Sequence, residues 1–395
     1  MNDRVISPKV ECSRRPEFWV ALAALLFAIL WLTLNVSFNY QGHISGLFYT
    51  GAMARVPVAI EGHTYRVKDQ KGYDAVFYHI IAHDPLIRRD FIPYVDNPQL
   101  RWRRIGVPAL ASLLAGGSDR FVDYTYVGIQ LAFVFLGAFW LSCYARAHDA
   151  GAIWGLAFLL IPAVMVSLDR MTIDLPLAAL CIALVLYDSK SRPQWPVYSI
   201  LCAAPLVRET GMILVVAWCL YSTLRRNWRD VLLGAGCAVP AILWWIYVRS
   251  RTPMDGTPWL SKYPFSGLIE RTIQGTGNST LTWWLRIAEA FEWLALAGIW
   301  LSVLLVLYFA FRRRIGLIEM IALVFTVFAA TLGKFDIWAS AYAAGRTMSP
   351  LLIMLGIFAL KERRYYFALP LALILPRIAL QYEAQLAGII RGIIH

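Results

Sequence analysis

The feature that most constrains this chain is its series of long apolar runs, which are separated by short charged breaks. Hydrophobic residues make up 59% of the 395 residues, charged residues make up 16%, and the mean hydropathy is +0.57. A soluble domain is closer to half apolar and a quarter charged. Several runs approach or exceed the roughly 18–20 residues that cross a bilayer as a helix. We therefore expect a single all-α polytopic membrane domain over residues 1–395.

The runs and breaks predict about eleven transmembrane helices and two long outer loops, at 40–123 and 250–283. The first run follows Arg14 and Arg15 and has no clear small-residue cleavage site, so we expect it to stay as an uncleaved anchor. The predicted spans are 18–39, 124–144, 150–168, 172–187, 194–207, 210–224, 230–249, 284–311, 315–333, 344–360 and 364–380.

Basic residues, which give the chain a net charge of +12, predict the orientation of the spans. They cluster in short joints such as Arg225-Arg226, Arg312 to Arg314 and Arg363-Arg364. Such joints favour the cytoplasmic side of a membrane. We expect a multi-pass protein of the bacterial inner membrane, with a cytoplasmic N-terminus and both long loops in the periplasm. The positive charge is explained by topology and by contact with anionic lipid headgroups, and we expect no nucleic-acid partner.

Residues 73–84 predict an amphipathic helix inside the first outer loop. Apolar and aromatic residues return at helical spacing there, and Pro85 ends the pattern. Asp74 lies at the start of this helix, where free backbone N–H groups favour an anion. An ionised aspartate in that position can act as a general base toward a hydroxyl group.

Charged residues near membrane spans are costly, and here they gather on the predicted outer side. Arginine keeps its charge and can grip a phosphate with two hydrogen bonds. The pattern predicts a cavity in which one carboxylate meets several guanidinium groups. Its members are Asp74, Asp84, Asp96, Arg101, Arg103, Arg104, Asp169, Arg170, Asp174, Arg208, Glu209 and Arg346.

Simpler structural roles remain open for each of these groups. Asp74 could only cap its helix, and Arg208 and Glu209 could form an ion pair between spans. Asp169 and Arg170 could lie in a solvated turn. The run from Arg101 to Arg104 could contact lipid headgroups.

The sequence does not predict a metal site. His79 and His83 are interpreted as polar residues at the membrane interface rather than as metal ligands. The six cysteines form no CxxC pair, which argues against a zinc site or a disulfide framework. A divalent metal cofactor stays an open alternative.

Five short segments resemble those of bacterial polytopic glycosyltransferases of the GT-C fold. They are GYDAVFYHIIAHDP (72–85), DNPQLRWRRIGVPALASLLA (96–115), LDRMTIDLP (168–176), LVRETG (206–211) and YAAGRTMSP (342–350). The resemblance implies a GT-C-like helix bundle whose long first periplasmic loop carries amphipathic helices and a catalytic acid.

The resemblance also implies a transferase that uses a polyprenyl-phosphate-linked sugar as donor and a glycan, lipid or protein as acceptor. Asp74 would be the catalytic base. Arg101, Arg104, Arg208 and Arg346 would be candidates to bind the lipid phosphate, and Asp84 would be a second acidic site. The charge pattern itself adds Arg170 and Glu209 as candidates for substrate or lipid-phosphate binding, with Tyr73, Tyr78 and Asp169 in support. The chain departs from the family pattern at Ala75-Val76, where Gly-Gln is expected, and this puts the choice of substrate in question.

Three other classes of function compete with this interpretation. A ligase or polymerase of O-antigen type would place its main outer loop late in the chain, whereas the larger loop here comes first. A lipid or solute transporter would place polar groups near the membrane midplane, often in repeated halves. A non-catalytic lipid-binding protein is compatible with the departure at Ala75-Val76.

Overall fold

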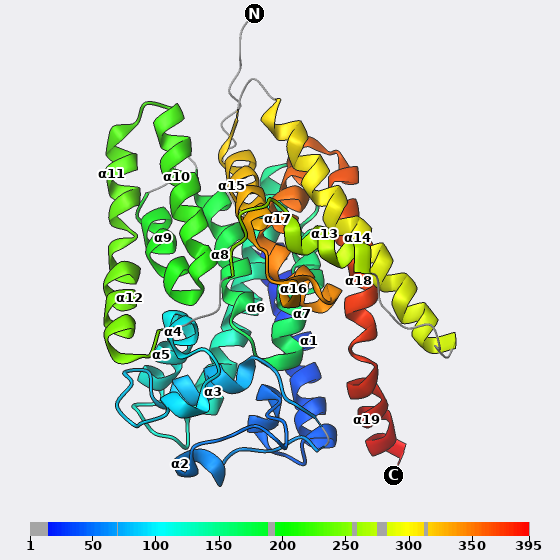
Figure 1. Cartoon of the computed structure of the whole chain (residues 1–395). Coiled ribbons are helices and arrows are strands. Elements are labelled where there is room, and N and C mark those ends of the chain that lie inside the picture. Colours follow the sequence, from blue (N-terminus) through cyan, green and yellow to red (C-terminus); the bar gives the residue numbers. More distant parts are fainter. Residues whose placement is uncertain are drawn as a thin grey trace, which may run out of the picture.

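The computed structural model describes residues 15–68, 70–188, 194–254, 259–274, 283–311 and 315–394. Regular structure in these residues is helical, apart from two isolated β-bridges. Figure 1 shows a bundle of helices with a mixed cap of loops and short helices at one end. The predicted basic joint at 312–314 lies outside the described residues, as do residues 189–193 between two predicted spans. So do residues 255–258 and 275–282 of the predicted second outer loop.

Each range predicted to span a membrane contains a helix, but the helices differ in length. Within the described ranges, five helices are long and apolar enough to cross a membrane, or up to seven if each bent pair counts as one span. This length and composition support a helical membrane protein, whereas the total of eleven spans stays a prediction. The long helices are α1 (Arg15–Leu34) with η1 (Asn35–Asn39), α6 (Val122–Ala147), α11 (Trp228–Gly236) with α12 (Val239–Arg251), α14 (Trp283–Ala310) and α17 (Ala341–Glu362).

The remaining bundle helices are bent or short. Two pairs are bent, by 59° and 46°: η4 (Ala152–Leu160) with α7 (Pro162–Arg170), and η6 (Tyr365–Ala368) and α18 (Leu369–Leu380) with α19 (Glu383–Ile394). The shorter apolar helices are α8 (Asp174–Tyr187), α9 (Trp195–Val207), η5 (Glu209–Gly211) with α10 (Met212–Leu224), and α15 (Leu317–Thr331).

The two faces of α1 are arranged as in a helix that faces lipid. Ala21, Ala24 and Ala28 form a buried stripe of small side chains, and α1 packs against α6. Trp19 and Phe27 point outward and are 62% and 58% exposed. Small residues at the helix contact and large apolar residues outside are typical of membrane helices. Lipid tails are as apolar as leucine, so a large apolar side chain gains little by being buried in the protein.

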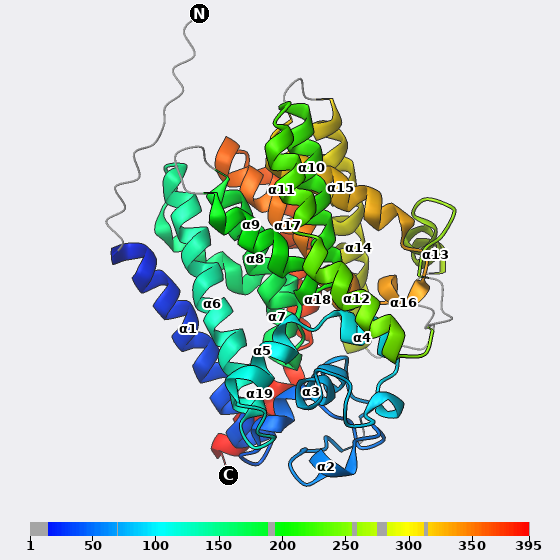
Figure 2. The same cartoon turned by 90° about the vertical axis from the view of Figure 1, so that its left-hand side faces the viewer.

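Helix α8 forms the centre of the bundle. All its residues from Asp174 to Leu186 are buried, and it contacts α6, α7, α9 and α17 (Figures 1 and 2). Its first residue, Asp174, is therefore a carboxylate inside the protein. A buried charge needs partners, and these come from the ends of the surrounding helices.

The first predicted outer loop folds as a cap with its own small core. The predicted helix at 73–84 is present as α3 (Ala75–His83). Phe48, Ile80 and Trp102 are fully buried in this cap core. The helices of the cap are η2 (Ile44–Phe48), α2 (Val58–Glu61), α3, η3 (Ile92–Tyr94), α4 (Pro98–Arg103) and α5 (Gly106–Leu114).

The second predicted outer loop contains one whole helix among its described residues, α13 (Ser266–Gln274). This helix packs on α16 (Phe335–Trp338).

Candidate functional site

A close crossing of two backbone segments places Asp74 at the start of α3. Gly72 has a φ of +88°, and a Cβ at this residue would lie 2.8 Å from the backbone nitrogen of Gly51. Glycine adopts this conformation without a steric penalty and leaves room for the crossing. Asp74 is the N-cap residue of α3, yet its side chain makes no capping hydrogen bond. The alternative that Asp74 only caps its helix is therefore wrong.

Both carboxylate oxygens of Asp74 accept hydrogen bonds from guanidinium groups. Oδ1 accepts from Nη2 of Arg101 at 2.9 Å, and Oδ2 accepts from Nη2 of Arg346, in α17, at 2.6 Å. The Asp74 side chain keeps 24% exposure, whereas those of Arg101 and Arg346 keep 9% and 11%. Burial by itself raises the pKa of Asp74, but the two guanidiniums outweigh it and hold the pKa well below its usual value.

The contacts continue from Arg101 to a second arginine of the cap. Arg101 also donates two hydrogen bonds to Asp96, at 2.9 and 3.0 Å. The hydroxyl oxygen of Tyr78 accepts from Arg101 at 3.2 Å and from Arg104 at 2.5 Å. Arg104 then forms a bidentate ion pair with Glu209, with both hydrogen bonds at 2.7 Å. Arg101 and Arg104 are buried against protein partners and do not lie on a surface that lipid headgroups cover.

The approach of α5 to the end of α9 makes the Arg104–Glu209 pair possible. A Cβ on Gly106 would lie 3.0 Å from the backbone nitrogen of Val207, so only a glycine fits there without displacement. The chain leaves α9 at Arg208 in an extended conformation, with φ −154° and ψ 142°. The two neighbouring residues thus take different partners: Glu209 binds Arg104, and Arg208 binds Asp174. The alternative that Arg208 and Glu209 pair with each other is wrong.

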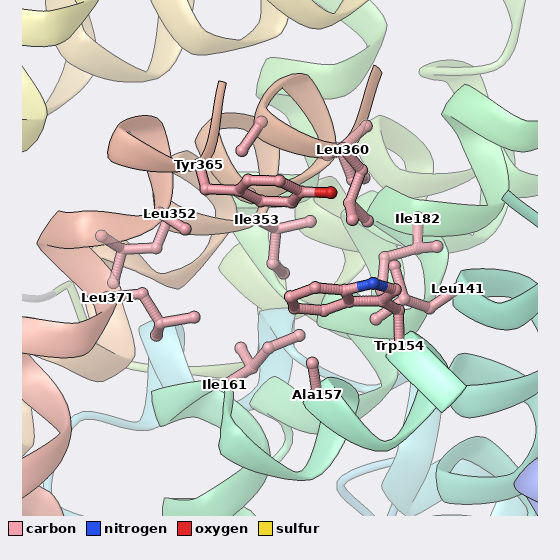
Figure 3. Close-up of a pocket in the computed structure, with 14 residues that line it drawn as sticks. Leu141, Trp154, Ala157, Ile161, Ile182, Leu352, Ile353, Leu360, Tyr365 and Leu371 are labelled. Atoms are coloured by element: carbon pink, nitrogen blue, oxygen red, sulfur yellow. The ribbon is translucent and has the colours of Figure 1, made fainter. Parts of the chain in front are cut away.

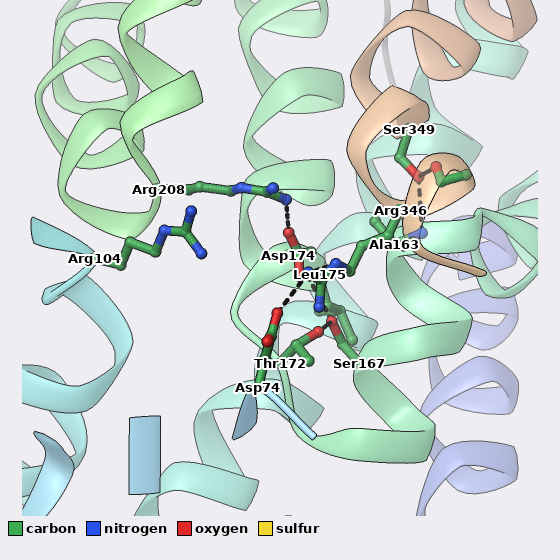
Figure 4. A network of polar contacts seen from close by, with 12 residues as sticks. Asp74, Arg104, Ala163, Ser167, Thr172, Asp174, Leu175, Arg208, Arg346 and Ser349 are labelled. Carbon is green, nitrogen blue, oxygen red and sulfur yellow. Dashed lines mark hydrogen bonds and ion pairs between the residues drawn. The ribbon is translucent and has the colours of Figure 1, made fainter. Parts of the chain in front are cut away.

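Asp174 receives two arginines at the start of α8. Nη1 of Arg208 donates to Oδ1, and Nε of Arg346 lies 3.6 Å from Oδ2 (Figure 4). The turn before α8 is held by Ser167, whose hydroxyl oxygen accepts from the backbone N–H of Leu175 at 3.1 Å. This turn aims the Asp174 carboxylate at both guanidiniums.

These contacts close into a ring, since Arg208 and Glu209 are adjacent in the chain. We call it the arginine ring. Its four guanidiniums face four carboxylates when Asp96 is included, so their formal charges balance. The ring consists of Asp74, Arg101, Tyr78, Arg104, Glu209, Arg208, Asp174 and Arg346.

Asp169 and Arg170 form a second buried cluster at the end of α7. Nε of Arg170 lies 3.1 Å from Oδ2 of Asp169, and the Arg170 guanidinium stacks on the ring of Tyr49. Asp169 also accepts from the hydroxyl of Tyr342 and from the amide of Gln385, each at 2.7 Å. The two residues are 3% and 5% exposed, so the alternative of a solvated turn is wrong.

Tyr73 connects the two clusters, and Asp84 belongs to neither. The Tyr73 ring lies 5.5 Å from that of Tyr342, and the Arg346 guanidinium is 5.3 Å from its centroid. Asp84 accepts hydrogen bonds from the backbone N–H groups of Arg88 and Arg89, at 2.7 and 2.9 Å. Its carboxylate therefore stabilises a turn of the cap.

A polar cavity of about 340 Å³ opens onto Asp74. Arg55 and Lys71 line it together with Tyr73, Phe77 and Val76. Asp74 thus stands between this cavity and the buried arginines. A cavity of about 310 Å³ elsewhere in the bundle is of a different kind, because apolar and aromatic side chains such as Trp154, Leu360 and Tyr365 line it (Figure 3). Of these two cavities, the polar one is the better candidate for an active site, because charged side chains line it.

The comparisons with known proteins add no family to this geometry. No family model, no curated protein and no solved structure matches the chain. The site is therefore interpreted from its own residues.

Proposed function

We propose that this chain is a membrane glycosyltransferase that moves a sugar from a polyprenyl phosphate to a hydroxyl acceptor, with inversion at the anomeric carbon. The observation that carries the proposal is the position of Asp74, between a polar cavity and two buried guanidiniums. An acid beside several guanidiniums supports the proposal, because this displacement requires a base and groups that stabilise the leaving phosphate. The proposed setting is the periplasmic side of the bacterial inner membrane.

The donor phosphate binds by taking Arg346 and Arg101 from Asp74. Arg346 is suited to this, because its Nη1 is buried and has no hydrogen-bond partner among the described residues. A guanidinium presents a planar set of donors that matches a phosphate. Arg104 and Arg208 stay on Glu209 and Asp174 and keep the charge of the ring balanced.

This exchange also makes Asp74 a better base. A carboxylate bound to two guanidiniums takes up a proton poorly, as its lowered pKa indicates. Once the phosphate holds the arginines, the burial that remains raises the pKa of Asp74. The bound donor therefore activates the base that deprotonates the acceptor hydroxyl.

The proton and charge changes balance in a single displacement. Asp74 accepts the proton of the acceptor hydroxyl, and the acceptor oxygen forms a bond to the anomeric carbon. The bond from that carbon to the phosphate oxygen breaks, and its electron pair stays on the phosphate. Asp74 loses one negative charge while the phosphate gains one, so the total charge facing the arginines is unchanged.

The departure at Ala75-Val76 concerns the cavity wall rather than the arginine ring. Val76 lines the polar cavity beside Asp74, whereas Ala75 is fully buried. An apolar valine at a position where the resembling family carries glutamine removes a polar group from that wall. We expect the change to affect the choice of sugar or acceptor and to leave the base and the arginines in place.

The test is a turnover assay on protein purified in nanodiscs, with a panel of polyprenyl-phosphate sugars. Asp74→Asn should abolish release of polyprenyl phosphate while lipid binding persists. The matched control is Asp336→Asn, because the Asp336 side chain is 75% exposed and pairs only with Lys334 among the described residues. Release at the wild-type rate by Asp74→Asn removes Asp74 from catalysis. No release with any donor, alongside clear lipid binding, would favour a non-catalytic lipid-binding protein, and a product of retained configuration excludes the single displacement.

A further inference from the structure

Two histidines of α3 lie on a face of the helix that the arginine ring does not use. His79 and His83 are four residues apart, so their side chains are neighbours along the helix. Both are buried, at 1% and 6% exposure, which differs from the expected position at a membrane interface. Their Nε2 atoms face each other at 3.3 Å.

A carboxylate from α6 meets the two imidazoles at the same point. Oδ1 of Asp123 lies 2.8 Å from Nε2 of His79 and 3.7 Å from Nε2 of His83. Ligand atoms around a tetrahedral metal ion, at bond lengths of about 2.0–2.1 Å, are about 3.3 Å apart. The three separations between the ligand atoms are 2.8, 3.3 and 3.7 Å, so each is within about 0.5 Å of the tetrahedral value. A metal ion therefore fits between the three atoms with small side-chain movements.

A carboxylate beside Nδ1 of His83 favours the tautomer that leaves Nε2 free to bind a metal. Nδ1 of His83 lies 2.8 Å from Oδ1 of Asp119, which is also bound by Nη1 of Arg89 at 2.7 Å. An imidazole that donates from Nδ1 to a carboxylate presents the lone pair of Nε2. A carboxylate behind a ligating histidine is the usual second layer of a metal site.

His79 is held by packing rather than by such a hydrogen bond. The ring of Phe48 stacks on its imidazole, with centroids 4.4 Å apart. Nδ1 of His79 has no hydrogen-bond partner among the described residues. The stacking fixes the plane of the ring and with it the direction of Nε2.

The geometry points to a divalent transition-metal site of the zinc class, formed by His79, His83 and Asp123, with solvent as the fourth ligand. Two imidazoles and one carboxylate suit zinc, whereas magnesium and calcium prefer oxygen ligands alone. The site joins α3 to α6. Because α3 also carries Asp74 and Tyr78, the metal sets the rotation of the helix that presents both to the arginine ring. The site does not depend on the proposed transferase function.

The experiment measures metal in full-length protein purified without an affinity tag. We expect about one zinc ion per chain by mass spectrometry, and intense visible absorption from tetrahedral cobalt(II) after exchange. A chelator should lower the Tm of the wild-type protein, and added zinc should restore it, because bound metal contributes to folding. This measurement needs no variant and so remains valid if a substituted protein fails to fold.

Variants then assign the ligands. His83→Gln and Asp123→Asn should lose the metal, and Asp119→Asn should weaken metal affinity about 10–100-fold, as an outer partner does. His63→Gln is the matched control, because His63 is an exposed histidine of the same cap. Protein that contains no metal, gives no cobalt absorption and keeps the same Tm with and without chelator and zinc overturns the proposal. So does metal that persists in His83→Gln and Asp123→Asn.

Discussion

The Arg104–Glu209 ion pair offers the sharpest test of the arginine ring, because it joins the cap to the bundle by two hydrogen bonds of 2.7 Å. The side chains are 9% and 26% exposed. Two unit charges about 4 Å apart attract by about 4 kcal/mol at an effective dielectric constant of about 20. Desolvation opposes part of this, and removal of one partner from a buried pair costs about 3–5 kcal/mol because the other charge stays behind.

We therefore expect Arg104→Met and Glu209→Gln each to lower the free energy of unfolding by about 3 kcal/mol. The double variant should cost little more than either single variant, which gives a coupling energy of about 2–3 kcal/mol. Tryptophan fluorescence during unfolding in mixed detergent micelles measures each value. The control cycle uses Arg66 and Glu61, a pair also at 2.7 Å but with side chains 33% and 52% exposed. Its coupling should stay below about 1 kcal/mol.

Additive costs for Arg104→Met and Glu209→Gln, within about 0.5 kcal/mol, would refute the reasoning. Such a result would mean that the two side chains do not share a buried ion pair. A coupling energy equal to that of Arg66 and Glu61 would mean that the Arg104–Glu209 pair is exposed to solvent. The arginine ring would then lack its contact between Arg104 and Glu209.

Three further predictions concern the placement of the ring. Gly72→Ala should lower the Tm and the turnover together, because φ is +88° and the new Cβ would lie 2.8 Å from the backbone of Gly51; unchanged values would contradict the crossing. Gly106→Val should destabilise the protein and lower the coupling energy between Arg104 and Glu209, since a Cβ at this residue would push α5 away from the end of α9; an unchanged coupling in unfolding experiments would contradict this. The third prediction concerns pH. Asp74 has a depressed folded-state pKa, so its stabilisation is present above the unfolded pKa of about 3.9 and is lost as pH falls through the lower folded value. The Tm difference between wild type and Asp74→Asn should therefore stay constant from about pH 7 to about pH 5 and shrink below about pH 4, and a decline near neutral pH would contradict the assignment.

Composition and periodicity were sufficient to predict the class of the protein and the position of its helices. In a bilayer no water is available to the backbone, so the N–H and C=O groups of a long apolar run form hydrogen bonds with each other in a helix. The ranges of such helices can therefore be predicted from the sequence. The helix at 73–84 also followed from its spacing and from Pro85. The number of spans could not be predicted in the same way, because helices such as α9, with 13 residues, are too short for composition to decide whether they cross.

The sequence by itself identified most of the charged residues of the site, because charges beside membrane helices are rare and need partners. It could not assign those partners. Glu209 lies next to Arg208 in the chain but binds Arg104, and Asp74 binds Arg346 across the molecule. His79 and His83 are four residues apart, as are Asp119 and Asp123, but these spacings did not lead to the prediction of a metal site. Only the packing of α3 against α6 brings the two pairs together, because side chains distant in sequence meet only where the tertiary structure closes the distance between their helices.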